Sequence, residues 1–216
     1  TMVTAAERDG DLWRIHLMDM EDGAISTVTA RALVNAGGPW VRRVIDDALH
    51  LPSTESVRLV RGSHIVTRKL FDHGKCYFFQ GEDGRIIFAI PYETDFTLIG
   101  TTDQEHHGNP GEAVCTPEET QYLCDFASKY FANPVTPDDV VWTYSGVRPL
   151  YDDGAKSATA ATRDYVLSLH TEGPAPLLNI FGGKITTYRV LSQSAFHKLA
   201  PFFPEAGEDW TAEVPL

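Results

Sequence analysis

Two separate segments of the chain, which are not an internal sequence repeat, each read as a short apolar strand, a double glycine, and then apolar residues at helical spacing. The first covers residues 32–49 and turns at Gly37-Gly38; the second covers residues 177–199 and turns at Gly182-Gly183. A strand, a tight turn and a helix form the unit from which α/β sheets are wound. The chain is therefore expected to contain α/β structure in both segments.

Elsewhere the periodicity is mainly that of antiparallel strands. Residues 1–30 predict a β-meander, because Asp- and Gly-rich turns at 9–11 and 21–23 separate three alternating runs. A helix is expected to begin after Thr116, where proline and two glutamates follow a capping residue. Strands are expected at residues 32–34, 59–67, 76–80, 86–91, 97–101, 140–144, 165–170 and 177–181, and helices at 41–49, 117–130 and 184–199.

Composition restricts the classes of function. The 216 residues are 43% apolar, as in ordinary globular proteins, and carry a formal net charge of -12. That charge argues against a nucleic-acid partner, because such binding depends on cations that neutralise phosphates. The three cysteines lack the spacing of a disulfide framework or a metal site, so we expect free thiols and no metal. No apolar run approaches the ~20 residues of a membrane-spanning helix.

The two glycine turns are candidate binding elements. Gly37-Gly38-Pro39-Trp40 alone is a weak signal, since close packing explains such a turn as well as a ligand does. The GxGxxG fingerprint of dinucleotide-binding proteins is found nowhere in the chain. Gly182-Gly183-Lys184 is a stronger signal, because a lysine at the positive end of a helix is unfavourable unless it faces an anion. We therefore favour a functional interpretation of Lys184.

His64 and Arg148 are the other notable polar residues. His64 lies in an otherwise apolar strand pattern, where a structural role is the commoner one. Arg148 follows Gly146, which permits close backbone approach, and precedes Pro149, which stiffens the chain. Its planar fork suits a carboxylate or a phosphate, although a structural salt bridge is an equal alternative. Residues 100–103 are interpreted as a simple turn.

Taken in order, six segments resemble the aerobic, FAD-dependent glycerol-3-phosphate dehydrogenases of the amino-acid-oxidase-like flavoproteins. These segments are residues 32–40, 61–66, 99–103, 141–150, 162–165 and 181–189. The family's amino-terminal fingerprint and helical carboxy-terminal domain have no counterpart in this sequence. The resemblance implies an α/β and α+β fold, in which FAD-binding segments flank a mixed, largely antiparallel substrate domain. The implied divisions are 1–50 and 148–199 for the FAD-binding domain, 51–147 for the substrate-binding domain, and 200–216 for a linker toward a further domain.

The resemblance also implies a reaction. Hydride passes from the second carbon of sn-glycerol 3-phosphate to FAD, giving dihydroxyacetone phosphate, and electrons continue to a membrane quinone. His64, Arg148 and Lys184 are the implied catalytic residues; Arg148, Arg163 and Lys184 the implied substrate-binding residues; and Gly37, Gly38, Pro39, Trp40, Gly182, Gly183, Lys184 and Thr186 the implied cofactor-binding residues. These residue types suit the chemistry, because a neutral histidine can accept an alcohol proton and cations can neutralise phosphate.

Two alternatives stay open: an oxidase that uses oxygen with the same substrate, and a non-enzymatic ligand-binding module that explains the absent fingerprint. The resemblance implies a cytoplasmic protein, peripherally associated with the inner face of the cytoplasmic membrane, and leaves a homo-oligomer open. Thr1-Met2 opens directly on a strand pattern and without a leader pattern, which we interpret as a cut end. The 216-residue chain alone is expected to fold but to be inactive and nearly free of FAD, because it lacks the unit that holds the FAD pyrophosphate.

Overall fold

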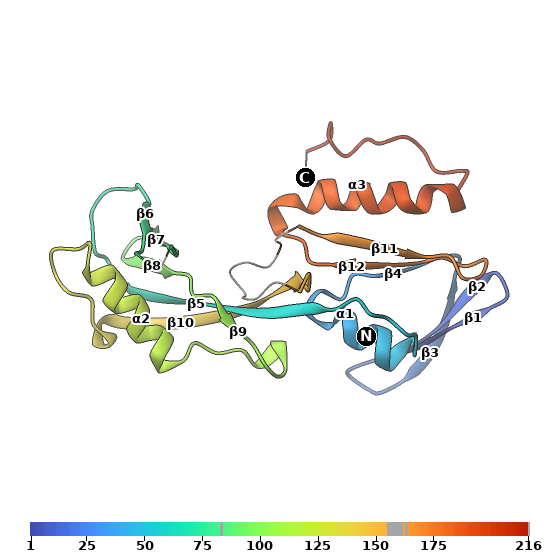
Figure 1. The fold of residues 1–216 in the computed structure, drawn as a ribbon, viewed down its shortest axis with the longest axis horizontal. Helices are drawn as coiled ribbons and strands as arrows, with labels where there is room; N and C mark the ends of the chain where they lie inside the picture. Colours follow the sequence, from blue (N-terminus) through green and yellow to red (C-terminus); the bar gives the residue numbers. More distant parts are fainter. Residues whose placement is uncertain (83, 155–161, 163, 216) are drawn as a thin grey trace. The chain divides into compact units, whose positions relative to one another are not determined.

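The chain forms two compact units in a computed structural model that describes residues 1–82, 84–154, 162 and 164–215 (Figure 1). Unit 1 comprises Thr1–Arg58 and Pro149–Leu216, and unit 2 comprises Leu59–Arg148. The sequence instead predicts divisions after residues 50, 147 and 199. The correspondence of these divisions to domains of a whole protein stays a prediction.

Unit 1 begins with the predicted β-meander. Strands β1 (Met2–Asp9), β2 (Leu12–Met18) and β3 (Ile25–Ala30) pair antiparallel in that order. One side of the meander is apolar and buried around Trp13, which is 2% exposed. The indole Nε1 of Trp13 donates a 3.0 Å hydrogen bond to the carbonyl of Pro176, so the ring is both buried and satisfied. This contact fixes the meander against the second sheet of the same unit.

The second sheet of unit 1 has β12 (Leu177–Phe181) at its centre, antiparallel to β11 (Val166–His170) and parallel to β4 (Leu33–Asn35). Every residue of β12 is buried. Leu178 and Ile180 pack with Ala195 of helix α3 (Tyr188–Leu199), while Phe181 packs with Val41 and Ile45. Figure 1 shows α3 lying along β11 and β12. A strand covered by helices on both faces is the expected α/β arrangement.

The helices after the two glycine turns start irregularly. The first is a 3₁₀ turn, η1 (Gly38–Trp40), followed by α1 (Val41–Arg43) and a π-helical turn, η2 (Val44–Ala48). After Gly183 the chain forms a 3₁₀ turn, η5 (Ile185–Thr187), before α3 begins. The predicted helix start at Lys184 is therefore wrong. Lys184 has extended backbone angles of φ -127° and ψ 151°, and its carbonyl accepts both the backbone N–H and the hydroxyl of Thr187. Lys184 therefore does not lie in the first turn of an α-helix, and the predicted unfavourable position at a helix dipole is not present.

Unit 2 is built on one sheet with strand order β10-β5-β8-β7-β6 and a short strand β9 paired to β5. Its strands are β5 (Val57–Arg68), β6 (Tyr77–Gln80), β7 (Ile86–Tyr92), β8 (Phe96–Gly100), β9 (Gln104–Glu105) and β10 (Val140–Tyr151). Antiparallel pairing joins β6 to β7, β7 to β8, and β5 to both β8 and β9. β10 continues seven residues past the predicted end at residue 144. The predicted fold class is confirmed.

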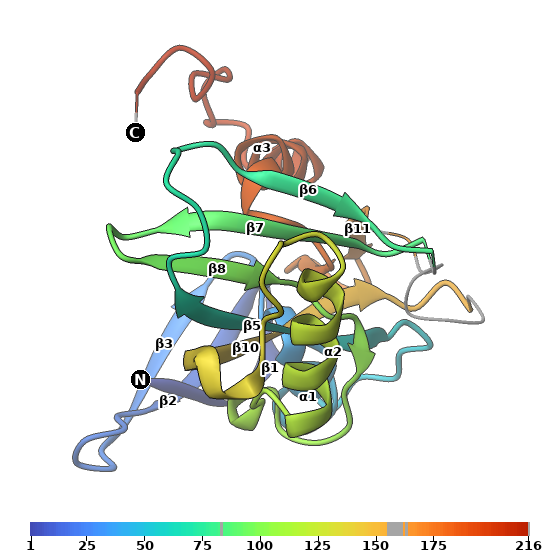
Figure 2. The ribbon, with the colours of Figure 1, turned by 90° about the vertical axis from the view of Figure 1, so that its left-hand side faces the viewer.

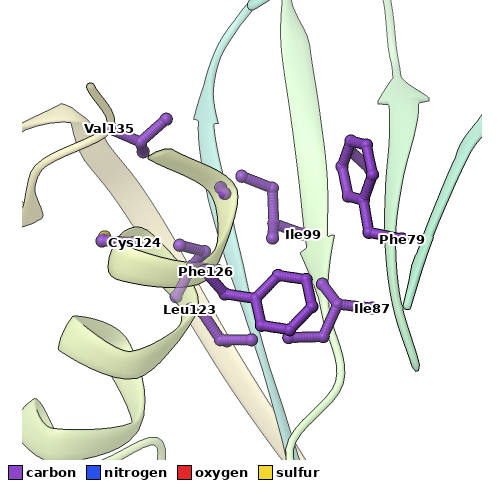
Figure 3. Close-up of a cluster of buried hydrophobic side chains, with 10 residues drawn as sticks. Phe79, Ile87, Ile99, Leu123, Cys124, Phe126 and Val135 are labelled. Carbon is purple, nitrogen blue, oxygen red and sulfur yellow. The ribbon is translucent and has the colours of Figure 1, made fainter. Parts of the chain in front are cut away.

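Helix α2 (Pro117–Ser128) covers one face of this sheet, as Figure 2 shows. Thr116 and Glu119 form a reciprocal capping box that fixes its first turn. The buried core under the helix, drawn in Figure 3, comprises Ile65, Phe79, Ile87, Ala89, Ile99, Leu123, Cys124, Phe126, Ala127 and Val135. Short 3₁₀ turns η3 (Pro110–Glu112) and η4 (Pro137–Asp139) lie on either side of α2 in the sequence.

The segment after α3 stays within unit 1. It begins with a 3₁₀ turn, η6 (Ala200–Phe202), and Glu205 then forms an ion pair with Arg31. Further on, the Asp209 carboxylate lies 2.8 Å from Nε2 of His197. In the part of the chain that the structure describes, no helix has both the length and the apolar character needed to cross a membrane.

Candidate active site

The face of the unit 2 sheet that is turned away from α2 carries a row of cross-strand partners. The row consists of Phe78 in β6, Phe88 in β7, Gly100 in β8 and His64 in β5, each paired with the next. Their sequence neighbours belong to the core under α2, and alternate residues of a strand point to opposite faces. A Cβ at position 100 would stand 2.7 Å from Cγ of His64. The imidazole therefore lies over Gly100, in space that any side chain there would fill.

The His64 ring is enclosed further by Tyr144 of β10. The two rings stack with centroids 4.8 Å apart and planes 4° from parallel. Burial lowers the pKa of His64 below its ordinary value, and the charge of Arg148 lowers it further. Nδ1 is buried without a hydrogen-bond partner among the described residues. His64 is thus a neutral imidazole near pH 7, which is the form that can accept a proton.

Arg148 is held by the three residues that follow β8. Its Nη1 donates to Oδ1 of Asp103 at 2.9 Å and to the carbonyl of Thr102 at 3.5 Å, and its Nη2 donates to Oγ1 of Thr101 at 3.2 Å. The guanidinium carbon lies against Gly62 of β5, where a Cβ would stand 2.7 Å away. The Arg148 side chain nevertheless keeps 32% of its surface exposed.

The close backbone approach predicted at Gly146 occurs at Gly62 instead. A Cβ at position 146 would meet nothing within 4 Å. Since Gly146 and Arg148 lie on the same strand with parallel side-chain directions, Gly146 cannot receive the guanidinium. The glycine that Arg148 requires lies on the adjacent strand β5.

A buried carboxylate supports the turn that cradles Arg148. Glu119, 4% exposed, accepts hydrogen bonds from Oγ1 of Thr102 at 2.7 Å and from the backbone N–H of Thr116 at 3.1 Å, and it pairs with Arg61 at 3.0 Å. Burial alone raises the pKa of Glu119. Hydrogen bonds from Thr102, Thr116 and Ser63, together with the Arg61 charge, outweigh burial and hold the pKa below its ordinary value. Glu119 is therefore an ionised structural group.

In unit 1 the Gly37-Gly38 turn is fixed by a buried asparagine. Asn35 is 5% exposed; its amide donates to the carbonyl of Val41 at 3.0 Å, and its Oδ1 accepts from the N–H of Gly37 at 3.3 Å. Gly38 has φ +54° and open space where a Cβ would stand, and Trp40 is 40% exposed. The turn thus presents uncovered backbone and an aromatic ring, as a flat cofactor would require.

In the second turn, backbone conformation and close packing explain why Gly182 and Gly183 are glycines. Gly182 and Gly183 have φ +78° and +104°, and a Cβ on Gly183 would stand 2.8 Å from a Leu191 methyl. Lys184 and Thr186 are exposed. The turn still presents the exposed ammonium of Lys184, which suits an anionic ligand. Arg163, the remaining predicted substrate-binding residue, lies outside the described residues.

Sequence reasoning missed several residues that surround His64 and Arg148. The sequence does not predict a role for Tyr144, Thr101, Asp103 or Glu119. Residues 100–103 resemble an ordinary turn, and Glu119 resembles an ordinary helix-capping residue. The signal that could have found them is the Thr-Thr-Asp run directly after a strand glycine. A polar run at a strand end places several side chains near a single point.

A histidine of lowered pKa and a hydrogen-bonded arginine in unit 2, together with the double-glycine turns of unit 1, are residue types that a flavin-dependent oxidoreductase can use. The chain belongs to the FAD dependent oxidoreductase family (DAO), whose model matches residues 1–189. FAD is the cofactor of this family, and the prediction of FAD is confirmed.

Within that family the resemblance to glycerol-3-phosphate dehydrogenases is confirmed. The chain is 46% identical over its whole length to the aerobic glycerol-3-phosphate dehydrogenase of Escherichia coli (strain K12), of which it covers 43%. It is 43% identical over its whole length to the D-erythritol 1-phosphate dehydrogenase of Brucella abortus (strain 2308), again covering 43%. The structure of the glycerol-3-phosphate dehydrogenase from Bacillus halodurans complexed with FAD superposes with a TM-score of 0.79 at 26% identity, over 96% of this chain and 39% of that one. The chain thus spans less than half the length of these relatives.

Proposed function

We propose that the native protein oxidises sn-glycerol 3-phosphate to dihydroxyacetone phosphate with FAD as the hydride acceptor. The observation that carries this proposal is the neutral, stacked imidazole of His64 beside a cradled arginine, in a chain 46% identical to a dehydrogenase of that name. The non-enzymatic alternative is disfavoured by the same relatives.

His64 accepts the proton of the substrate hydroxyl in this proposal. Oxidation of a secondary alcohol removes a hydride from carbon and a proton from oxygen, and a base positioned at the oxygen accelerates both losses. A lowered pKa keeps His64 deprotonated and ready at neutral pH. When bound, FAD supplies the two-electron acceptor for the hydride.

Arg148 binds and orients the substrate. Its Nη1 donates to the Asp103 carboxylate, whereas its Nη2 donates to a neutral hydroxyl, Oγ1 of Thr101. Because the Arg148 side chain is partly exposed, its guanidinium is proposed to donate to a substrate oxygen without breaking the ion pair to Asp103. Arg163 and Lys184 are proposed as further cations for the phosphate, because a dianion needs several donors in a protein of net charge -12.

The turns of unit 1 are proposed to contact the cofactor. Gly37, Gly38, Pro39 and Trp40 would present the first turn, and Gly182, Gly183, Lys184 and Thr186 the second. The exposed Lys184 would stabilise negative charge on the reduced ring, which is a preorganised electrostatic role.

A second substrate is supported by a specific comparison. The relative named D-erythritol 1-phosphate dehydrogenase differs in identity from the E. coli relative by only three percentage points, 43% against 46%, over the same chain. A four-carbon polyol phosphate is thus the second candidate. Both candidates share a phosphate and a secondary alcohol, so His64 and Arg148 serve the same roles for either.

The electron acceptor and its consequences belong to the same proposal. A respiratory quinone is the proposed acceptor, with oxygen as the alternative, and a quinone acceptor requires peripheral contact with the inner face of the cytoplasmic membrane. A homo-oligomer is compatible with either acceptor.

The test is anaerobic reduction of the FAD-loaded native protein, followed by flavin absorbance. Addition of sn-glycerol 3-phosphate is expected to bleach the flavin rapidly, and D-erythritol 1-phosphate to bleach it slowly. The reverse order would assign the enzyme to the four-carbon substrate, and bleaching by neither would contradict the proposal. Reoxidation by a soluble quinone or by oxygen then identifies the acceptor.

A further inference from the structure

We propose that Glu119 and Thr102 are positioning residues that hold Arg148 in its binding geometry. The inference rests on the function proposed above, because Arg148 acts there as the substrate-binding arginine. Arg148 has a long, partly exposed side chain, so other residues of unit 2 must hold it in one place.

The hydroxyl of Thr102 connects two elements. Thr102 is fully buried; its Oγ1 accepts the backbone N–H of Ser63 in β5 at 2.9 Å and donates to Oε1 of Glu119 in α2 at 2.7 Å. The hydroxyl hydrogen and a lone pair are both used, so the geometry at Thr102 is determined from two sides. Ser63 is also the neighbour of His64.

The residues on either side of Thr102 are those that hold Arg148. Oγ1 of Thr101 and Oδ1 of Asp103 accept from the two ends of the guanidinium, and the carbonyl of Thr102 itself accepts from Nη1. Any shift of the Thr102 backbone therefore moves all three acceptors together. Because binding a phosphate or hydroxyl demands placement within a fraction of an ångström, such a shift weakens the substrate contact.

Glu119 supplies the fixed end of this arrangement. Its second oxygen accepts from the N–H of Thr116 and pairs with Arg61, so the carboxylate cannot rotate away from Thr102 without losing both. The carboxylate stays ionised because its pKa is held below the ordinary value by those donors despite burial. The first turn of α2 thus sets the position of the Arg148 cradle through a charge-assisted hydrogen bond.

The experiment compares three variants of the FAD-loaded native protein. Thr102→Val removes the connecting hydroxyl at nearly constant volume, and Thr102→Ser restores it. Thr97→Val is the matched control, because Thr97 is 1% exposed and its hydroxyl also accepts a backbone N–H, that of Leu70, at 3.1 Å. Steady-state kinetics with sn-glycerol 3-phosphate and calorimetric binding of dihydroxyacetone phosphate are measured for each variant.

Thr102→Val is expected to lower kcat/KM and product affinity by about 10- to 100-fold, the scale of a misplaced binding group. Thr102→Ser is expected to restore both, and Thr97→Val to change neither by a comparable factor even if it lowers the unfolding temperature equally. Equal kinetics for Thr102→Val and Thr97→Val would overturn the inference while leaving the proposed function intact. A wild-type protein that oxidises neither polyol phosphate would instead overturn the proposed function, and the inference with it.

A second comparison applies even if Thr102→Val does not fold. Glu119→Gln keeps the shape of the side chain but has only one oxygen for its several donors, so a loss in the same direction is expected. In an Arg148→Lys background, Glu119→Gln is expected to add little, because the fork that it positions is already gone. Fully additive losses would show that Glu119 acts independently of Arg148, which would overturn the inference.

Discussion

The guanidinium of Arg148 rests on the backbone of Gly62, with Cζ 2.7 Å from where a Cβ of residue 62 would stand. The glycine and the arginine belong to neighbouring strands, β5 and β10, and their contact lies on the face of the sheet that α2 does not cover. Strand β5 thus provides the surface on which the binding fork lies flat.

Gly62→Ala is expected to displace the Arg148 fork and lower kcat/KM by about 10- to 100-fold. The clash involves the far end of a flexible side chain, so the unfolding temperature should change little. Gly146→Ala is the matched control, since a Cβ there meets nothing within 4 Å. Equal kinetics for the two variants would contradict the contact.

Arg148→Lys is expected not to restore function. A single ammonium cannot reach Oδ1 of Asp103 and Oγ1 of Thr101 while also offering a fork to substrate. Steady-state kinetics of this variant are the measurement, and wild-type values would rule out a role for the planar fork.

His64→Ala is expected to slow flavin reduction by about 100-fold, the usual scale for loss of a general base. The single-turnover rate measures this step separately from reoxidation. An unchanged rate would make His64 a structural residue that fills the space over Gly100.

Tyr144→Ala is expected to move the acid limb of the pH profile upward. The neutral imidazole is the active form, so the rate falls as pH drops through the pKa of His64, and burial keeps that pKa low. Removing the stacked ring exposes the imidazole, which returns its pKa toward the ordinary value. Tyr144→Phe, which keeps the stack, should leave the limb unchanged; a shift in both variants would point to the hydroxyl instead.

Lys184→Met is expected to raise KM and lower turnover through the loss of one positive charge, whereas Lys184→Arg should retain most activity. The control for net charge is Lys198→Met, an exposed lysine near the end of α3. If Lys184→Met and Lys198→Met behave alike, Lys184 has no anion-facing role.

Strands could be predicted well from the sequence because their signal is local. β12 was expected at the residues where it lies, and the meander followed from alternation and Asp-Gly turns. The start of α3 could not be predicted, because a 3₁₀ turn and the first turn of an α-helix place apolar residues at similar spacing, and here a 3₁₀ turn over Ile185–Thr187 precedes the helix.

The surroundings of the site depend on pairing between strands, which no single segment encodes. His64 and Arg148 could be singled out as unusual residues, but their neighbours in space are distant in sequence. Gly100 and Tyr144 lie 36 and 80 positions from His64, and Gly62 lies 86 positions from Arg148. Glu119 both caps helix α2 and accepts a hydrogen bond from Thr102. The sequence pattern predicts only the capping role.

The side chains of Asn35 and Asn179 meet at 2.9 Å, although 144 positions separate them along the chain. Their strands, β4 and β12, are adjacent in unit 1, and all of unit 2 is inserted between them. During synthesis on the ribosome, unit 2 is complete once residue 148 has emerged, whereas β4 must wait for a partner made about thirty residues later. The order of translation therefore favours early folding of the inserted unit. The hydrogen bond between the Asn35 and Asn179 amides forms afterwards, when β12 pairs with β4.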